Sequence, residues 1–404
     1  MRTPSLVGII PGPGEPNYIM NTYLPPMIKD LQDLWKGVEM KLPTGNKLVR
    51  AALLCTGCNI PASKKLCGFR GFGSARGCNR CFKLFEGSGF HKSYADFDRN
   101  LWPKCTNLDH HQNAEEIKSA TTLDEKERFE VKDGLRYSAL IQLPYCDAIR
   151  MFSVIDPLHN FYLGTTKHII ILFEDVWLGN ESISHQTLES VQSRMASIVC
   201  PEDTGRIPSN ITSKFGGNQW KNRTKLFSSI LTGAHLECWR HFVLASRLLS
   251  KANLSTTELL LADALLLQFC RRCVSPYGEV GTPNMHLHAH IREGIKDYGP
   301  TPGFWLFAFE QYNGLLGRQP NNHSPKVQIM CRFTRESSLF HIQPSTEFHE
   351  QFCSMYPLSN VSDVQTSGSQ TISVTHWAQI TSSDLTIVKW SIDLTYFKLP
   401  TNSR

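Results

Sequence analysis

Long apolar runs are missing from this chain of 404 residues. Its longest, HIIILF from His168, meets Glu174 and Asp175 and is far shorter than the ~20 residues that span a bilayer. The early run SLVGIIPG is too short for a secretory signal and is interrupted by proline and glycine. We therefore expect a protein of a reducing compartment that is neither secreted nor held in a membrane.

A strong charge of one sign is missing as well. The 42 Lys and Arg against 36 Asp and Glu leave a formal charge of +6, and charged residues make up only 19% of the chain against 41% apolar residues. This composition is typical of a globular protein, not of a disordered one. The small basic excess is compatible with a nucleic-acid partner but does not require one, and the sequence contains no run of five basic residues that would indicate nuclear import.

The signatures of common enzymes are also absent. The stretch RGFGSARGC is rich in Gly and Arg, yet it has neither the Walker spacing nor G-x-G-x-x-G, and no G-x-S-x-G or kinase signature occurs. Nothing therefore predicts a small-molecule substrate.

Apolar periodicity predicts an α/β region, a helical region and a β-rich tail. Helical spacing begins near two prolines and predicts a helix over 21–40, and the near-continuous apolar run that follows predicts a buried strand over 48–55. We expect six segments: 1–85 as strand, helix and strand with a C-x-x-C pair, 86–134 as a surface insertion, 135–224 as the core continued, 225–275 as a helical insertion, 276–333 as a histidine cluster with the Glu310 helix, and 334–404 as a Ser/Thr-rich β tail.

Paired cysteines and clustered histidines suggest a metal site. Thirteen cysteines in a reducing compartment favour metal ligation over disulfides, and Cys78 and Cys81 form a C-x-x-C pair. The stretch MHLHAH offers His286, His288 and His290, of which His286 and His290 share a helix face. Two cysteines and two of these histidines would complete a structural zinc site. The alternative is a pair of buried thiols and core histidines without a metal.

Two acidic residues stand in unusual surroundings. Glu310 lies among aromatic residues in FWLFAFEQYNG, where a carboxylate is costly unless it is paired or bound to metal; a rim position facing solvent is the alternative. In DPLHN, Asp156 before Pro157 is typical of a helix cap, and together with His159 it also suits a ligand or orienting pair at an active site. The two roles of Asp156 are compatible.

In their order along the chain, several blocks from about Leu6 to Phe333 resemble the DDE/D transposases of the CACTA (En/Spm-like) class. These blocks are GIIPGPGEPN, LWKGVEM, CNIPASKKLCGF with GCNRC, DPLHNFYLGTTKH, QWKNRTKLFSSIL, TPNMHLHAHI, DYGPTPGFWLFAFEQYNGLLG and QIMCRF.

The resemblance implies an incomplete RNase H-like α/β core with an inserted all-helical region and a β-rich C-terminal tail. Such enzymes hold two Mg²⁺ or Mn²⁺ ions on three acids, and related recombinases carry a structural zinc on C-x-x-C and two histidines. Glu310 corresponds to the third acid, whereas the position of the second acid holds Asn59. The strand with the first acid is expected before Met1. Asp147 and Asp156 are alternative second acids.

The implied function is therefore binding of transposon-end DNA in the nucleus by a homo-oligomer whose ancestor cut and joined DNA. A neutral amide holds divalent cations less well than a carboxylate, so we expect defective catalysis, with Mg²⁺ or Mn²⁺ needed only if activity survives. One rival is a non-enzymatic zinc-stabilised module that binds DNA or protein. The other is the unstable product of a pseudogene.

Overall fold

The computed structural model describes residues 20–42, 45–87, 89, 92–169, 189, 193, 197, 217–226, 233–277, 281–317, 379–382 and 385–393. Nearly all of them belong to one compact unit, Asn17–Glu310 with Val374–Thr395. The described part of the chain is mixed α/β and mostly helical. The predicted strand at 5–12 and the block QIMCRF lie outside the described residues.

The helices and strands follow in this order: α1 Met20–Tyr23, α2 Pro25–Lys36, β1 Val38–Leu42, β2 Gly45–Gly57, α3 Ile60–Cys67, η1 Arg99–Leu101, α4 Asn107–Ser119, α5 Leu123–Asp133, η2 Ala139–Gln142, η3 Ala148–Phe152, η4 Leu158–Thr166, α8 Gly217–Leu226, α9 Gly233–Leu249, α10 Thr256–Tyr277, α11 Pro283–His288, α12 Ile291–Tyr298, η7 Thr301–Gly303, α13 Phe307–Gly317, β3 Gln379–Ser382 and β4 Leu385–Asp393.

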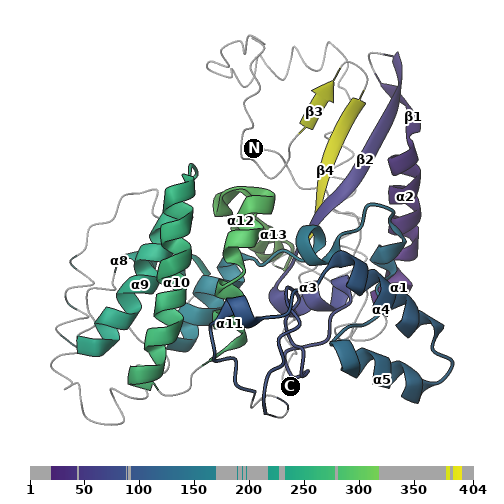
Figure 1. Cartoon of the computed structure of the whole chain (residues 1–404). Coiled ribbons are helices and arrows are strands. Elements are labelled where there is room, and N and C mark those ends of the chain that lie inside the picture. The colour runs from purple at the N-terminus through teal and green to yellow at the C-terminus, as the bar shows by residue number, and fades with distance from the viewer. Residues whose placement is uncertain are drawn as a thin grey trace, which may run out of the picture. The chain divides into compact units, whose positions relative to one another are not determined.

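The sheet described here has the strand order β1-β2-β4-β3 (Figure 1). β1 and β3 are antiparallel to their neighbours, whereas β2 and β4 run parallel. β2 is exposed at its start and buried from Ala51 onward except at half-buried Leu54, so the strand predicted at 48–55 is present but longer. A parallel bridge joins Thr56, near the end of β2, to Ser153, which lies three residues before Asp156 of the DPLHN stretch. This strand order defines a mixed α/β architecture and does not by itself define an RNase H-like core.

The helix predicted over 21–40 is too long at its end. α2 stops at Lys36 because Gly37 has φ +111°, a backbone conformation that side chains other than glycine rarely adopt, and β1 begins at the next residue. A Cβ at Gly37 would also lie 2.9 Å from the Leu48 side chain of β2. The sequence pattern missed this turn because Val38, seven residues after Leu31, also fits helical spacing.

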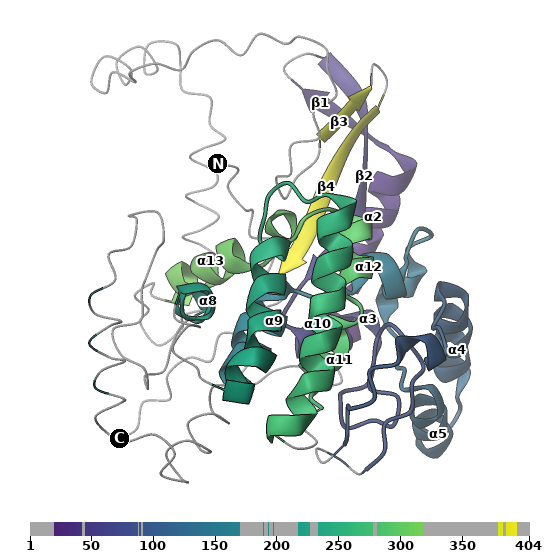
Figure 2. The same cartoon turned by 60° about the vertical axis from the view of Figure 1, so that its left-hand side comes forward.

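The helical region predicted at 225–275 corresponds to α9 and α10, which pack along each other (Figure 2). Trp239, Phe242 and Phe269 form their buried aromatic contact. α11 and α12 follow directly, and α11 packs on η4. Gly164 allows that approach, since a Cβ there would lie 2.5 Å from the Asn284 side chain.

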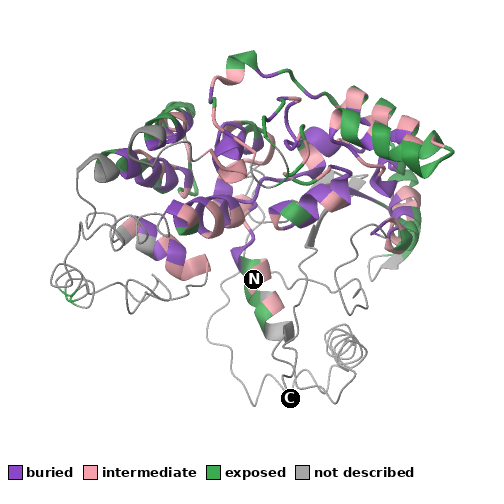
Figure 3. Cartoon of the chain, turned by 90° about the horizontal axis from the view of Figure 1, so that it is seen from below, coloured by how far each residue is buried: buried purple, intermediate pink, exposed green. Residues whose placement is uncertain are grey.

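The segment predicted as a surface insertion, 86–134, contains α4 and α5. α5 is largely exposed (Figure 3), and a Thr106–Asp109 capping box begins α4. Yet α4 also buries His110, whose Nε2 lies 3.1 Å from the carbonyl of Cys67 at the end of α3. No helix among the described residues is long and apolar enough to cross a bilayer.

Candidate metal centre and acidic site

The loop at Cys78 and Cys81 has the local shape of a metal-binding turn. The backbone N–H of Arg80 donates to Cys78 Sγ at 3.2 Å, which orients the first thiol. Cys81 forms an antiparallel bridge with Lys104, and the N–H of Phe82 donates to Pro103, so the second thiol is held on a paired backbone. Both cysteines are buried.

His286 and His290 reach this loop from the other side of a large sequence gap. Thr282 caps α11 by accepting from Met285, and Pro283 occupies the first turn. His286 lies within α11, and His290 lies at the start of α12. They stand four residues apart and are both buried.

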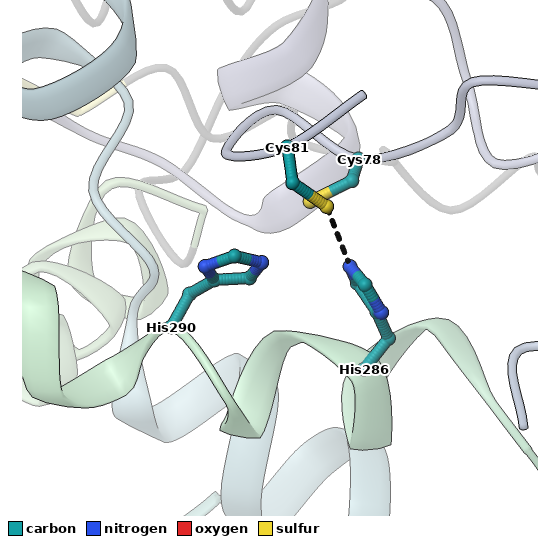
Figure 4. Close-up of side chains that lie close together, drawn as sticks. All are labelled: Cys78, Cys81, His286 and His290. Carbon is teal, nitrogen blue, oxygen red and sulfur yellow. Dashed lines mark hydrogen bonds between the residues drawn. The ribbon is translucent and has the colours of Figure 1, made fainter. Parts of the chain in front are cut away.

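The four side chains form one cluster, with their ligand atoms all within 4.8 Å of one another. Figure 4 shows the two thiols facing the two imidazoles, with Cys81 Sγ 3.4 Å from His286 Nε2. The Trp102 ring lies 4.3 Å from the His286 ring and shields the cluster. Two thiols and two imidazoles in a buried tetrad are the donor set of a tetrahedral metal such as zinc.

The hydrogen bonding of the imidazoles fits a metal. Glu293 Oε2 lies 3.1 Å from His290 Nδ1, so the other nitrogen, Nε2, is the one left to ligate. His290 Nε2 is buried and has no hydrogen-bond partner in the part of the chain that the structure describes. A buried polar atom without a partner is costly, and a metal ion at the cluster would satisfy it.

The electrostatics favour a thiolate at Cys78, whereas the hydrogen bond with Cys78 together with burial raises the pKa of Cys81. Burial alone would raise the pKa of Cys78, but the Cys81 thiol and the imidazoles of His286 and His290 hold that pKa well below its ordinary value. The thiolate is the form that ligates a metal.

His288, the third candidate ligand, lies elsewhere. It is fully buried, with Nε2 3.0 Å from Thr165 Oγ1 and Nδ1 3.7 Å from Cys270 Sγ. Burial lowers its pKa to about 3, so it stays neutral. It is a core histidine between α10 and η4, and the choice left open by the sequence falls on His286 and His290.

Asp156 is a buried carboxylate with several donors. It accepts from the N–H of Leu158 at 3.2 Å and of His159 at 2.9 Å, so it caps η4, as its place before a proline predicts. It also accepts from the N–H of Leu306 at 3.0 Å, which draws in the segment that leads to Glu310.

His159 joins the two candidate acids. Its Nδ1 lies 2.6 Å from Asp156 Oδ2 and its Nε2 lies 3.2 Å from Glu310 Oε1. Burial alone would lower the pKa of His159, but hydrogen bonds and charge attraction from both carboxylates raise it to about 9. The imidazole is therefore a cation at neutral pH. Glu310 is neither deeply buried nor fully at the rim, with its side chain 35% exposed.

Asn59 caps α3, where its Oδ1 accepts from the N–H of Ala62 at 2.9 Å. Because Thr56 and Ser153 pair in parallel, Asn59 and Asp156 each lie three residues beyond the same bridge. Asp147 caps η3 by accepting from Ile149 and Arg150. The structure thus places Asp156 and Glu310 on the two ring nitrogens of His159, whereas Asn59 and Asp147 cap helices.

Arg80 connects the cysteine loop to the segment that leads to Asp156. It lies between the two cysteines, its side chain is 1% exposed, and it donates to the Ser153 carbonyl at 3.0 Å. Ser153 precedes Asp156 by three residues, so the cysteine loop supports the segment that carries this acid.

Sequence reasoning missed two features of the helical region. Cys270 and Cys273 form a second C-x-x-C pair, and Cys273 Sγ lies 2.9 Å from Cys238 Sγ across the α9–α10 contact. The C-x-x-C spacing of Cys270 and Cys273 was the available signal, but the helical pattern of apolar residues around it indicated two core cysteines. Glu293, three residues after His290, was also missed.

A scan against models of known protein families finds no match, and a search of curated proteins finds no similar sequence.

Proposed function

We propose that this chain is a transposase-derived DNA-binding protein of the CACTA class, with a structural zinc and a defective catalytic centre. The observation that carries the proposal is the placement of Asp156 and Glu310 on opposite nitrogens of His159. A two-metal nuclease core needs acids from distant parts of the sequence brought to one place, and Asp156 and Glu310, the latter on the late helix α13, supply two of the three acids. An RNase H-like core, action on transposon ends, homo-oligomers and nuclear location belong to the same proposal.

Charge explains why catalysis is defective. A protonated His159 offsets one of its two carboxylate partners, and Asn59 contributes no charge at the position of the second acid. Divalent cations favour sites with several carboxylate oxygens, so Mg²⁺ or Mn²⁺ would bind weakly. We expect no cleavage of plasmid DNA by the native chain with either cation.

The zinc part rests on the buried cluster of Cys78, Cys81, His286 and His290. Zinc supplies no chemistry to a substrate there, because all four positions of a tetrahedral ion are filled by the protein. It would join the cysteine loop to α11 and so hold in place the segment of Ser153 and Asp156, which the loop contacts through Arg80.

The test measures Mn²⁺ binding by electron paramagnetic resonance. Asn59→Asp keeps the helix cap and adds a carboxylate three residues beyond the Thr56–Ser153 bridge, the same offset as that of Asp156, so we expect at least about tenfold tighter Mn²⁺ binding. Adding Glu310→Gln to this variant should remove the gain. An unchanged affinity in Asn59→Asp would leave the second candidate, a zinc-stabilised binding module in which Asp156 and Glu310 only position His159. The hydrogen bond that Asp156 accepts from the backbone of His159 and the ion pair of Glu310 with His159 favour this second candidate.

A further inference from the structure

The described part of α8 carries positive charge on one side. Lys221 and Lys225 lie four residues apart and are half-buried, while the adjoining face of the helix buries Trp220 and Thr224. Arg247 of α9 donates to the carbonyl of Lys225, so a third cation lies beside them. Among the described residues, neither lysine forms an ion pair, which distinguishes them from Lys83 and Lys251, each of which has a carboxylate partner.

Two aromatic rings complete this group. The Lys221 ammonium lies 5.2 Å from the centre of the Trp305 ring and 4.7 Å from that of Phe307. These rings hold the stem of the lysine in place by cation–π attraction without neutralising it. Trp305 and Phe307 flank Leu306, whose N–H donates to Asp156, so the cations adjoin the acidic site.

The cations are held at a cost that an anion would relieve. Burial together with the charges of Lys221 and Arg247 lowers the pKa of Lys225 to about 8, and burial lowers the pKa of Lys221. Bringing like charges together in a half-buried place opposes folding unless a counter-charge is supplied. Such groups of cations are typical of phosphate-binding surfaces.

We infer that Lys221, Lys225 and Arg247 form a binding site for the phosphate backbone of a nucleic acid. Side chains four residues apart on a helix begin about 5–6 Å apart, which suits neighbouring phosphates of one strand better than a single small anion. An aromatic ring beside a row of cations is also the arrangement by which nucleic acids are held along a groove. The inference rests on the proposed function only for the choice of duplex DNA as the polyanion.

The experiment measures binding of a ~20-base-pair DNA duplex by fluorescence anisotropy, across a series of salt concentrations and without added divalent metal. Lys221→Gln with Lys225→Gln should weaken binding by about 10- to 100-fold at ~0.1 M salt and should reduce the salt slope by about 2. Lys221→Arg with Lys225→Arg should restore both. The control, Lys126→Gln with Arg128→Gln on exposed α5, removes the same charge elsewhere and should change binding far less.

Unchanged affinity and slope in the Lys221→Gln, Lys225→Gln variant would overturn the inference, as would a native chain that does not bind the duplex. Displacement of DNA by millimolar inorganic phosphate at constant ionic strength would overturn it too, in favour of a site for one phosphate group. Because the assay uses neither Mn²⁺ nor cleavage, failure of the Mn²⁺ experiment would remove the proposed function without affecting this result.

Discussion

His159 is the residue whose environment differs most from what its sequence neighbours indicate. The D-x-x-H spacing places Asp156 next to it, and that half of the arrangement could be predicted from the cap rule. The second partner, Glu310, comes from a helix far along the chain and could not, because no local pattern connects the two stretches. A histidine between two carboxylates therefore emerges only when the chain folds.

The raised pKa of His159 makes stability depend on pH. Its pKa is about 9 in the folded protein and about 6.5 when unfolded, so its contribution is fully present below pH 6.5 and is lost as pH rises through 9. We expect His159→Gln to remove roughly 2–3 kcal/mol of unfolding free energy at pH 6 and little at pH 9.5. Urea denaturation at the two values measures this, with His241→Gln as the control. Equal losses at both pH values would contradict the ion pairs.

Asn59 tests the difference between capping and catalysis. Asn and Asp are nearly equal as helix caps, so Asn59→Asp should leave the free energy of unfolding almost unchanged, whereas Asn59→Ala should lower it by about 1 kcal/mol. Thermal or urea unfolding of the native chain and of the two variants measures both differences in the free energy of unfolding. A large loss in Asn59→Asp would mean that the new carboxylate is repelled by Asp156 when no metal is present.

At the scale of elements, the spacing of the histidines in and after α11 can be predicted from the sequence, but the cysteines that they contact cannot. The four-residue spacing of His286 and His290 predicts two histidines on one helix face; in the structure α11 ends at His288, and His290 lies at the start of α12. That His288 turns away into the α10–η4 contact follows from the same helical period. Which cysteines they meet does not, since Cys81 lies 205 residues away in sequence.

Metal removal should therefore act on α11 and the cysteine loop together. We expect one zinc ion per native chain, its loss in Cys78→Ser, and a fall of several kcal/mol in unfolding free energy, because metal binding is coupled to folding. Elemental analysis and urea denaturation measure the two effects. His288→Asn is the matched control, which should keep the zinc although it disturbs the core. Zinc retained in Cys78→Ser would place the ion elsewhere.

Across the whole molecule, ion pairs join helices that the sequence separates. Asp263 of α10 is 5% exposed and accepts two hydrogen bonds from Arg99 of η1, at 2.7 and 2.6 Å, and a third from Arg292 of α12 at 3.3 Å. Like the metal cluster, this contact connects the segment after the cysteine loop to the helical region.

Removing the charge of Asp263 should loosen that connection. Asp263→Asn leaves two arginines facing a neutral amide, and we expect a loss of roughly 2–4 kcal/mol in unfolding free energy. Asp30→Asn, an equivalent change on the exposed side of α2, is the control and should have almost no effect. Equal behaviour of the two variants in urea would show that the buried pair contributes nothing.

The sequence by itself determined the local features: the buried strand before Asn59, the cap at Asp156, the helical character of α9 and α10, and a C-x-x-C pair with histidines at helical spacing. These follow from hydrophobic period and from hydrogen bonds within a few residues, which single stretches encode. Only the tertiary structure decided that Asp156 and Glu310 both contact His159, that His290 rather than His288 faces the thiols, and that α2 ends at Lys36 and not at 40. Contacts between distant segments depend on the packing of the whole core, and no stretch of sequence carries that information alone.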